Sequence, residues 1–498
     1  MPSEPREQAP TSQARAGSGE SYAGKTVKSV AWLGGSQLLR QGAAIVTTVV
    51  LARLLTPADY GIFAMTLFIN ELAQLLVNFG IGSALIQRKQ INQLMLSTCF
   101  WLNLAIAGVV AGLVVLAAPA AADFYRQPKV AELLLVSALT VCIGALMVIP
   151  QVVLSRELRF HHVAVGASAG SLIGAAATIA LAVSGAGVWA LVAQPLIGTT
   201  INLAFLAWRA GWWPSWRFQL SSVRGVIVFS SHLLIDGLAS HFTRNLQQLI
   251  VAPVLGATAI GLLTMATMAA WLPVSLFTQA AAGVLYPVFS KLQDEKGRLL
   301  SGIRRATVVI AIVTFPLLSG LAILAPDVMP LMFGQQWSAT APLVSVLCVL
   351  CMVQSVSGVG GSAMLAQGRS LATMNLSLLG LPLVGTALWL TRDIDILSVT
   401  IALAVSHGII SILKLHLALR SMPGGWAAMI GAVWQPLLCA LGMAAVLWVA
   451  RGHAMDWSPA VRLLLLICAG ALAYVVLTLA LNRQGWSQLL EILQQRGG

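Results

Sequence analysis

Long runs of apolar residues, separated by short polar segments, repeat along nearly the whole chain. Each run has about 20 residues or more, which is the length that a helix needs to cross the hydrocarbon core of a bilayer. Residues 1–24 are polar and rich in Ser, Gly, Pro and Glu, so we expect a disordered tail there. The pattern predicts an all-α polytopic membrane protein with about fourteen transmembrane helices. The expected helices span residues 29–53, 60–86, 93–118, 130–153, 162–184, 187–208, 225–252, 258–283, 303–325, 339–363, 371–390, 397–418, 428–450 and 461–481.

The composition supports a lipid environment. Apolar residues make up 58% of the 498 and charged residues only 9%, whereas a soluble domain has roughly 25% charged residues. In lipid, backbone groups must be satisfied within the segment, which favours helices. A net charge of +13 would be typical of nucleic-acid binding in a soluble protein, but here Lys and Arg collect in loops. We therefore expect no nucleic-acid partner.

The positions of Lys and Arg predict the orientation of the chain. With the N-terminal tail in the cytoplasm, 21 of these cations fall in cytoplasmic segments and 6 in external loops. Cytoplasmic loops are the ones enriched in Lys and Arg, so an even number of helices with both termini in the cytoplasm is expected. Two of the 29 cations, Arg40 and Arg244, lie inside predicted helices and are left over from this count.

An internal repeat relates two halves of the chain. LARLLTPADYGIFAM at 51–65 matches VAPVLGATAIGLLTM at 251–265, with Leu, Gly and Met at corresponding positions, among them Gly61 and Gly261. Six predicted helices separate the two copies, so both copies run in the same direction. This predicts two pseudo-symmetric six-helix lobes and two appended helices, with a substrate site between the lobes. The predicted parts are a tail (1–24), an N-lobe (25–220), a C-lobe (221–420) and a C-terminal part (421–498).

Polar side chains form stripes on three of the predicted helices. Spacings of three and four residues place them on one face of each helix. We predict that the stripes face one another across a central hydrated vestibule. They comprise Ser36, Gln37, Arg40, Gln41, Ala44 and Thr48, then Asn70, Glu71, Gln74 and Asn78, then His232, Asp236, Ser240 and Arg244.

Ionisable side chains at the centre of a transmembrane helix are costly and usually face an internal cavity. A structural interpretation is that Glu71 and Arg40 pair inside the bundle. The functional interpretation is that Arg40 and Arg244 attract an anionic headgroup, because guanidinium matches phosphate in geometry. Asp236 and Glu71 are then candidates for ion coupling. The predicted substrate-binding residues are Arg40, Arg244, Gln37, Gln41 and Gln74.

Motifs for catalysis or cofactor binding are not recognisable. Cys348 and Cys351 are spaced like zinc ligands but have no partner ligands nearby, and the chain contains no P-loop for ATP. The glycines at 166, 170 and 174 share one helix face, which predicts close helix packing. We therefore expect no metal, no cofactor and no enzyme activity.

Several segments resemble the polysaccharide transporter family, the Wzx-type flippases of the multidrug/oligosaccharidyl-lipid/polysaccharide exporter superfamily. The closest likeness is to the exopolysaccharide branch of the colanic-acid or xanthan kind. It covers roughly residues 25–420. The segments are LARLLTPADYGIFAM (51–65), FGIGSALIQRK (79–89), GVWALVAQ (187–194), VLYPVFSKLQDE (284–295) and APDVMPLMFGQQW (325–337).

The resemblance implies a flippase for undecaprenyl-pyrophosphate-linked repeat units in the bacterial inner membrane. The implied partners are this lipid-linked oligosaccharide, membrane lipids, and a polysaccharide polymerase with its co-polymerase. The family's cationic cavity would correspond to Arg40 and Arg244. The alternatives are an ion-coupled multidrug exporter of the same superfamily or a non-transporting membrane component of polysaccharide assembly. An enzyme would be expected to bring a large external loop or a His/Asp motif.

Overall fold

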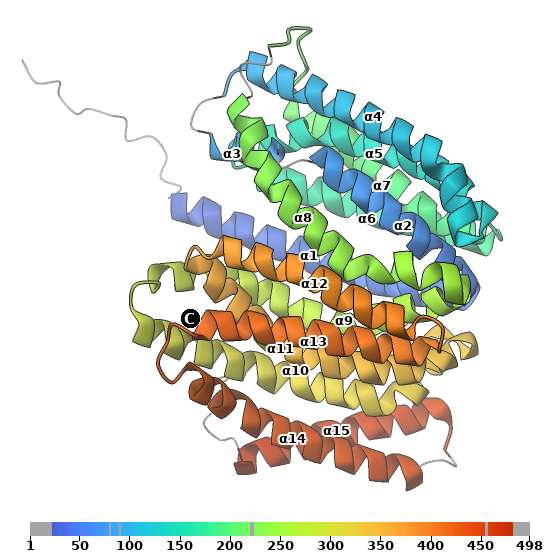
Figure 1. The fold of residues 1–498 in the computed structure, drawn as a ribbon, viewed down its shortest axis with the longest axis vertical. Helices are drawn as coiled ribbons and strands as arrows, with labels where there is room; N and C mark the ends of the chain where they lie inside the picture. Colours follow the sequence, from blue (N-terminus) through green and yellow to red (C-terminus); the bar gives the residue numbers. More distant parts are fainter. Residues whose placement is uncertain (1–21, 79–80, 89–90, 220–223, 454–456, 482–498) are drawn as a thin grey trace, which may run out of the picture.

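The computed structural model describes residues 22–78, 81–88, 91–219, 224–453 and 457–481, and the regular structure of this part of the chain is helical. The long helices lie side by side, with α4 at one edge of the molecule and α14 and α15 at the other (Figure 1). An all-α fold is therefore confirmed for the described residues.

Fourteen of the described helices have 22 residues or more. Two short helices, α3 (Ile81–Gln87) and the 3₁₀ helix η2 (Gln335–Thr340), lie between them. The long helices are α1 (Tyr22–Leu54), α2 (Pro57–Asn78), α4 (Gln93–Tyr125), α5 (Pro128–Arg156), α6 (Phe160–Val183), α7 (Val188–Ala210), α8 (Arg224–Ile250), α9 (Ala252–Lys291), α10 (Lys296–Phe333), α11 (Ala341–Ala366), α12 (Ser370–Thr391), α13 (Ile396–Leu419), α14 (Gly425–His453) and α15 (Pro459–Leu481).

Most predicted ranges agree with these helices, and one is wrong. The predicted helix at 60–86 is divided into α2, which ends at Asn78, and α3, which begins at Ile81. Asn is common at helix C-termini, and α2 ends at Asn78. Helices α9 and α10 extend well beyond their predicted ranges, because an apolar run marks only the part of a helix inside lipid.

Twelve of the fourteen long helices are apolar and long enough to cross a membrane. The two that do not belong to this set are α1 and α8, which carry Arg40 and Arg244. The protein is thus a multi-pass membrane protein. The count of fourteen spans stays a prediction.

The packing of the helices repeats in the two halves of the chain. In the N-lobe α1 packs on α6, α4 on α5, and α6 on α7. In the C-lobe α8 packs on α12, α10 on α11, and α12 on α13, so each pair has its counterpart six long helices later. Helices α14 and α15 pack on each other and on α10. The predicted pseudo-symmetric lobes with two added helices are confirmed, while the residues chosen as lobe boundaries stay predictions.

The two lobes meet where α2 crosses α9, at the centre of the sequence repeat. A methyl group on Gly61 would overlap the carbonyl group of Ala257, and one on Gly261 would overlap that of Pro57. These four residues correspond to one another in the 200-residue register, so the contact is symmetric. Only glycine allows two backbones to approach this closely. The glycines at 166, 170 and 174 likewise face α7, as predicted.

Replacing Gly61 with alanine is expected to lower the midpoint of thermal unfolding in detergent. The added methyl meets backbone rather than a flexible side chain, so the helices must separate, at a cost of about 1–3 kcal/mol. Gly108→Ala in α4 is the matched control, since nothing lies within 4 Å of its added methyl. Equal midpoints for the two variants would show that the α2–α9 crossing tolerates the methyl.

Candidate functional site

Arg40 lies in α1, and its guanidinium reaches α6. It donates a hydrogen bond to Ser168 Oγ at 3.4 Å and another to Gln37 Oε1, one turn earlier in α1. Both of these acceptors are neutral. The Arg40 side chain is partly exposed and Gln37 is exposed. A guanidinium presents several N–H donors, so it can hold neighbouring side chains and still bind an anionic ligand.

Arg244 lies in α8 and is exposed. Among the described residues, its guanidinium makes no hydrogen bond and no ion pair; only its backbone carbonyl accepts a bond, from Gln247. Glu71 of α2 lies close enough to interact with it electrostatically. An arginine inside a transmembrane helix normally pairs with a counter-ion. Arg244 is therefore an exposed cation beside Glu71 whose guanidinium donors are open to an anionic ligand.

Glu71 is half exposed and faces α8 rather than α1. Its Oε2 lies 3.7 Å from Nδ1 of His241. His241 is buried and stacks on Phe68, with ring centroids 5.1 Å apart. The pairing of Glu71 with Arg40 that the sequence leaves open stays a prediction. The structure groups Glu71, His241 and Arg244 at the α2–α8 contact.

The other predicted site residues have different surroundings. Gln74 turns into the N-lobe, where its Nε2 donates to the Thr140 carbonyl of α5 at 3.1 Å, and Gln41 is half-buried. Asp236 and His232 belong to α8, but their side chains lie outside the described residues. A vestibule shared by Arg40 and Arg244 stays a prediction.

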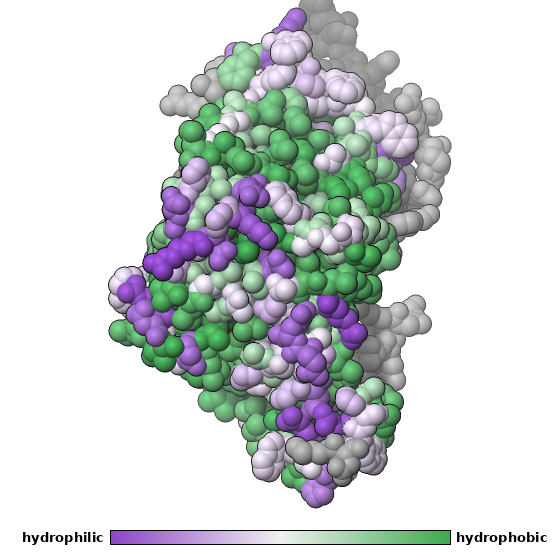
Figure 2. Space-filling model, turned by 90° about the vertical axis from the view of Figure 1, so that its right-hand side faces the viewer, coloured by the Kyte–Doolittle hydropathy of each residue, from purple (hydrophilic) through white to green (hydrophobic). Residues whose placement is uncertain are grey.

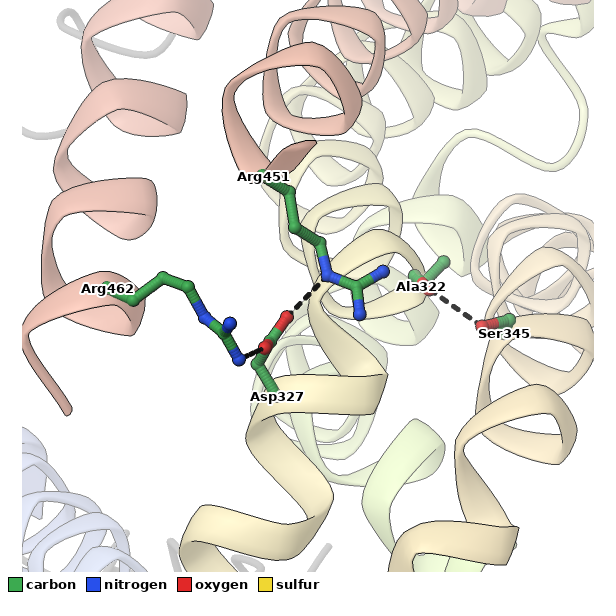
Figure 3. A network of polar contacts seen from close by, with 5 residues as sticks. All are labelled: Ala322, Asp327, Ser345, Arg451 and Arg462. Carbon is green, nitrogen blue, oxygen red and sulfur yellow. Dashed lines mark hydrogen bonds and ion pairs between the residues drawn. The ribbon is translucent and has the colours of Figure 1, made fainter. Parts of the chain in front are cut away.

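A polar network at α10 was missed by the sequence reasoning. Asp327 is buried, and its Oδ2 accepts a hydrogen bond from Arg451 Nε at 2.6 Å, while Arg462 donates to Oδ1. The two arginines come from α14 and α15, so one carboxylate joins three helices (Figure 3). The signal in the sequence was an acid inside an apolar run, but nothing there shows which cations meet it.

An apolar groove of about 410 Å³ lies between α10, α11, α13 and α14. Its lining includes Phe315, Met352, Trp426 and Met429, and none of the predicted vestibule residues. This lining is mostly apolar, which suits hydrocarbon.

The chain matches the model of a family described as "Polysaccharide biosynthesis protein" over residues 50–342, which is more than half of its length. The chain belongs to this polysaccharide biosynthesis family. The resemblance indicated by the sequence segments is confirmed.

Curated relatives agree with the polysaccharide biosynthesis family. The chain is 29% identical to the lipopolysaccharide biosynthesis protein WzxC of Escherichia coli, covering 69% of this chain and 70% of that protein. It is 26% identical to the succinoglycan biosynthesis transport protein ExoT of Rhizobium meliloti, covering 95% and 96%. It is 25% identical to the teichuronic acid biosynthesis protein TuaB of Bacillus subtilis, covering 84% and 88%. The names of these relatives, like the description of the family, come from polysaccharide biosynthesis.

Solved structures show the fold of this family member. The lipid II flippase MurJ in an inward closed conformation superposes with a TM-score of 0.75 at 14% identity, covering 91% of this chain and 99% of that one. An inward-facing multidrug MATE transporter superposes with a TM-score of 0.58 at 13% identity, covering 78% and 96%. The chain has the fold that these transporters share.

Proposed function

We propose that this protein is a flippase that carries undecaprenyl-pyrophosphate-linked oligosaccharide repeat units across the bacterial inner membrane for exopolysaccharide biosynthesis. The observation that carries the proposal is Arg244, an exposed guanidinium in α8 that forms no ion pair with any other described residue. Helix α8 is a transmembrane helix by prediction. A pyrophosphate is the kind of anion that a guanidinium binds with two parallel hydrogen bonds.

The physical need for such a protein is clear. Pyrophosphate and several sugars cannot lose their water in hydrocarbon without a large cost, so they require a polar path. Arg244 and Arg40 would bind the pyrophosphate, with Gln37 and Gln41 placed to hydrogen-bond sugar hydroxyls. The prenyl chain would stay in lipid. Gln74 is engaged with α5 and would act by shaping the N-lobe.

The proposed orientation has both termini in the cytoplasm, so the loading side is the end of the bundle where α1 begins. The excess of cations in the loops at that end supports it. A polysaccharide polymerase and its co-polymerase would receive the unit on the opposite side.

The purified protein in proteoliposomes tests the proposed function. Lipid-linked oligosaccharide placed in the inner leaflet should become accessible to an external sugar-specific lectin, with a time course that empty liposomes lack. A multidrug exporter would instead move a fluorescent cation, and a non-transporting assembly component would move neither. Either of these two results would overturn the proposal.

Glu71 and Asp236 are proposed to couple transport to an ion gradient, because Glu71 is an exposed acid beside Arg244. Glu71→Gln is expected to transport at a rate that no longer responds to an imposed proton or sodium gradient. Glu132→Gln is the control, since Glu132 is an exposed acid far along the chain in α5. Transport by the wild-type protein that ignores every imposed gradient would end the coupling role.

A further inference from the structure

Arg53, in the last turn of α1, reaches across to the C-lobe. Its Nε donates to the Met332 carbonyl of α10 at 3.0 Å, and a terminal nitrogen donates to the Leu331 carbonyl. The last carbonyls of a helix lack partners within the helix, and they carry partial negative charge. A side chain of one lobe thus caps a helix end of the other.

The C-lobe returns the same kind of contact. Gln336 Nε2 donates to the carbonyls of Ala52 and Leu55, the latter at 2.9 Å, and Trp337 Nε1 donates to Ala52 at 2.8 Å. The Trp337 side chain is fully buried, and Tyr60 of α2 meets it edge-on with centroids 5.2 Å apart. The two family-like segments at 51–65 and 325–337 are therefore in direct contact.

Helix α1 has exposed side chains in its middle and a buried residue near its C-terminal contact with the C-lobe. Gln37 and Leu39 are exposed, as are Glu71 of α2 and Arg244 of α8. By contrast, Ala52 at the other end of α1 is fully buried. Gln37 and Arg244 among the predicted substrate residues are thus exposed, while Ala52 is covered where α1 meets the C-lobe.

We propose that Arg53, Gln336 and Trp337 form a latch that closes the path between the lobes at the predicted external end and must release for substrate to leave. The inference rests on the proposed flippase function. All of its donors are side chains and all of its acceptors are helix-end carbonyls, so water can satisfy both when the lobes part. Arg53 is already exposed, so its hydrogen bonds are the part of the latch that water can replace most easily.

The C-lobe half of the latch is held by the Asp327 network. Asp327 precedes Met332 in α10 by little more than one turn and joins α10 to α14 and α15. The outer end of α10 therefore moves with these two helices, and α1 is the partner that separates from it. Figure 2 views this end of the molecule, where hydrophilic residues gather in patches among hydrophobic ones.

Hydrogen–deuterium exchange of the full protein in nanodiscs, without substrate, tests the latch itself. Arg53→Ala is expected to raise the exchange of amides in residues 325–340 about fivefold, the factor for losing one hydrogen bond of ordinary strength. Arg53→Lys keeps the positive charge but loses the planar guanidinium, so its exchange rate should lie between those of the wild type and Arg53→Ala. Lys129→Ala, an exposed cation at the same end, is the control. Equal exchange in Arg53→Ala and Lys129→Ala would overturn the latch.

A covalent lock tests whether the latch must open. Arg53→Cys and Met332→Cys, joined by a short bifunctional thiol reagent, are expected to stop transport, and a reductant that cleaves the linker should restore it. The two single-cysteine variants, treated alike, control for the six natural cysteines. Transport at the wild-type rate with the link in place would overturn the proposal. If no variant transports substrate while the exchange result holds, the flippase function fails and the latch contact stands.

Discussion

Replacing Arg244 with alanine is expected to reduce the transport of lipid-linked oligosaccharide about tenfold to a hundredfold, with the protein inserted at its normal level. A hydrogen bond to a charged group contributes about 1.5–3 kcal/mol, and each 1.4 kcal/mol corresponds to a factor of ten. The guanidinium is exposed and makes no ion pair with a described residue, so its removal leaves no buried partner behind. The loss should therefore appear in function and not in stability.

The matched substitutions separate charge from geometry. Arg244→Lys keeps the positive charge but loses the planar fork, so an intermediate rate is expected. Arg305→Ala removes an exposed cation from α10 outside the candidate site and should transport normally. Arg40→Ala should lose less than Arg244→Ala, because Gln37 and Ser168 already take up part of the donor capacity of Arg40. The proposal fails if both arginine variants, and the double variant, transport at the wild-type rate.

The proteoliposome assay is the measurement for all of these variants, with protein amount and thermal midpoint determined in the same preparations. Initial rates at several substrate densities would show where the loss lies. An arginine that binds the headgroup in the loaded state should raise the substrate density needed for half-maximal rate. A loss confined to the maximal rate would instead place Arg244 in the conformational change.

The sequence could predict the helices because each one has to match the thickness of a bilayer, and a run of apolar residues records that length directly. It could also place Gly61 and Gly261 at corresponding positions of an internal repeat. The structure shows why both positions are glycine. The backbones of α2 and α9 touch there, and any side chain would overlap a carbonyl group of the other helix. These features follow from local or repeated constraints.

The orientation of each polar stripe could not be predicted in the same way. Helical periodicity shows which residues share a face, but not the neighbour towards which that face is rotated. Glu71 and Gln74 lie on one stripe, yet Glu71 approaches His241 of α8 and Gln74 bonds to Thr140 of α5. Asp327 and its two arginines are more than 120 residues apart along the chain, so no spacing connects them.

A large loss of stability is expected when the network of Asp327, Arg451 and Arg462 is broken. Asp327→Ala should destabilise the protein by about 3–5 kcal/mol, the usual cost of breaking a buried ion pair from one side. The carboxylate is shared by Arg451 and Arg462, whose side chains are 30% and 20% exposed. Without it, two partly buried cations would face each other, and α14 and α15 would lose their polar anchor on α10.

Thermal unfolding in detergent measures this effect, with Ser345→Ala as the control. The Ser345 hydroxyl donates to the Ala322 carbonyl at 2.7 Å and to the Ala341 carbonyl of its own helix at 3.1 Å, and it carries no charge, so its loss should cost about 1 kcal/mol (Figure 3). Arg451→Ala and Arg462→Ala should each lose an amount of stability between those of Ser345→Ala and Asp327→Ala, because Asp327 keeps one partner. If Asp327→Ala unfolds no earlier than Ser345→Ala, the network does not hold α14 and α15 in place. The surviving folded Asp327→Ala protein should still bind substrate normally, because Arg40 and Arg244 belong to α1 and α8, so its defect should lie in protein amount and in release of substrate.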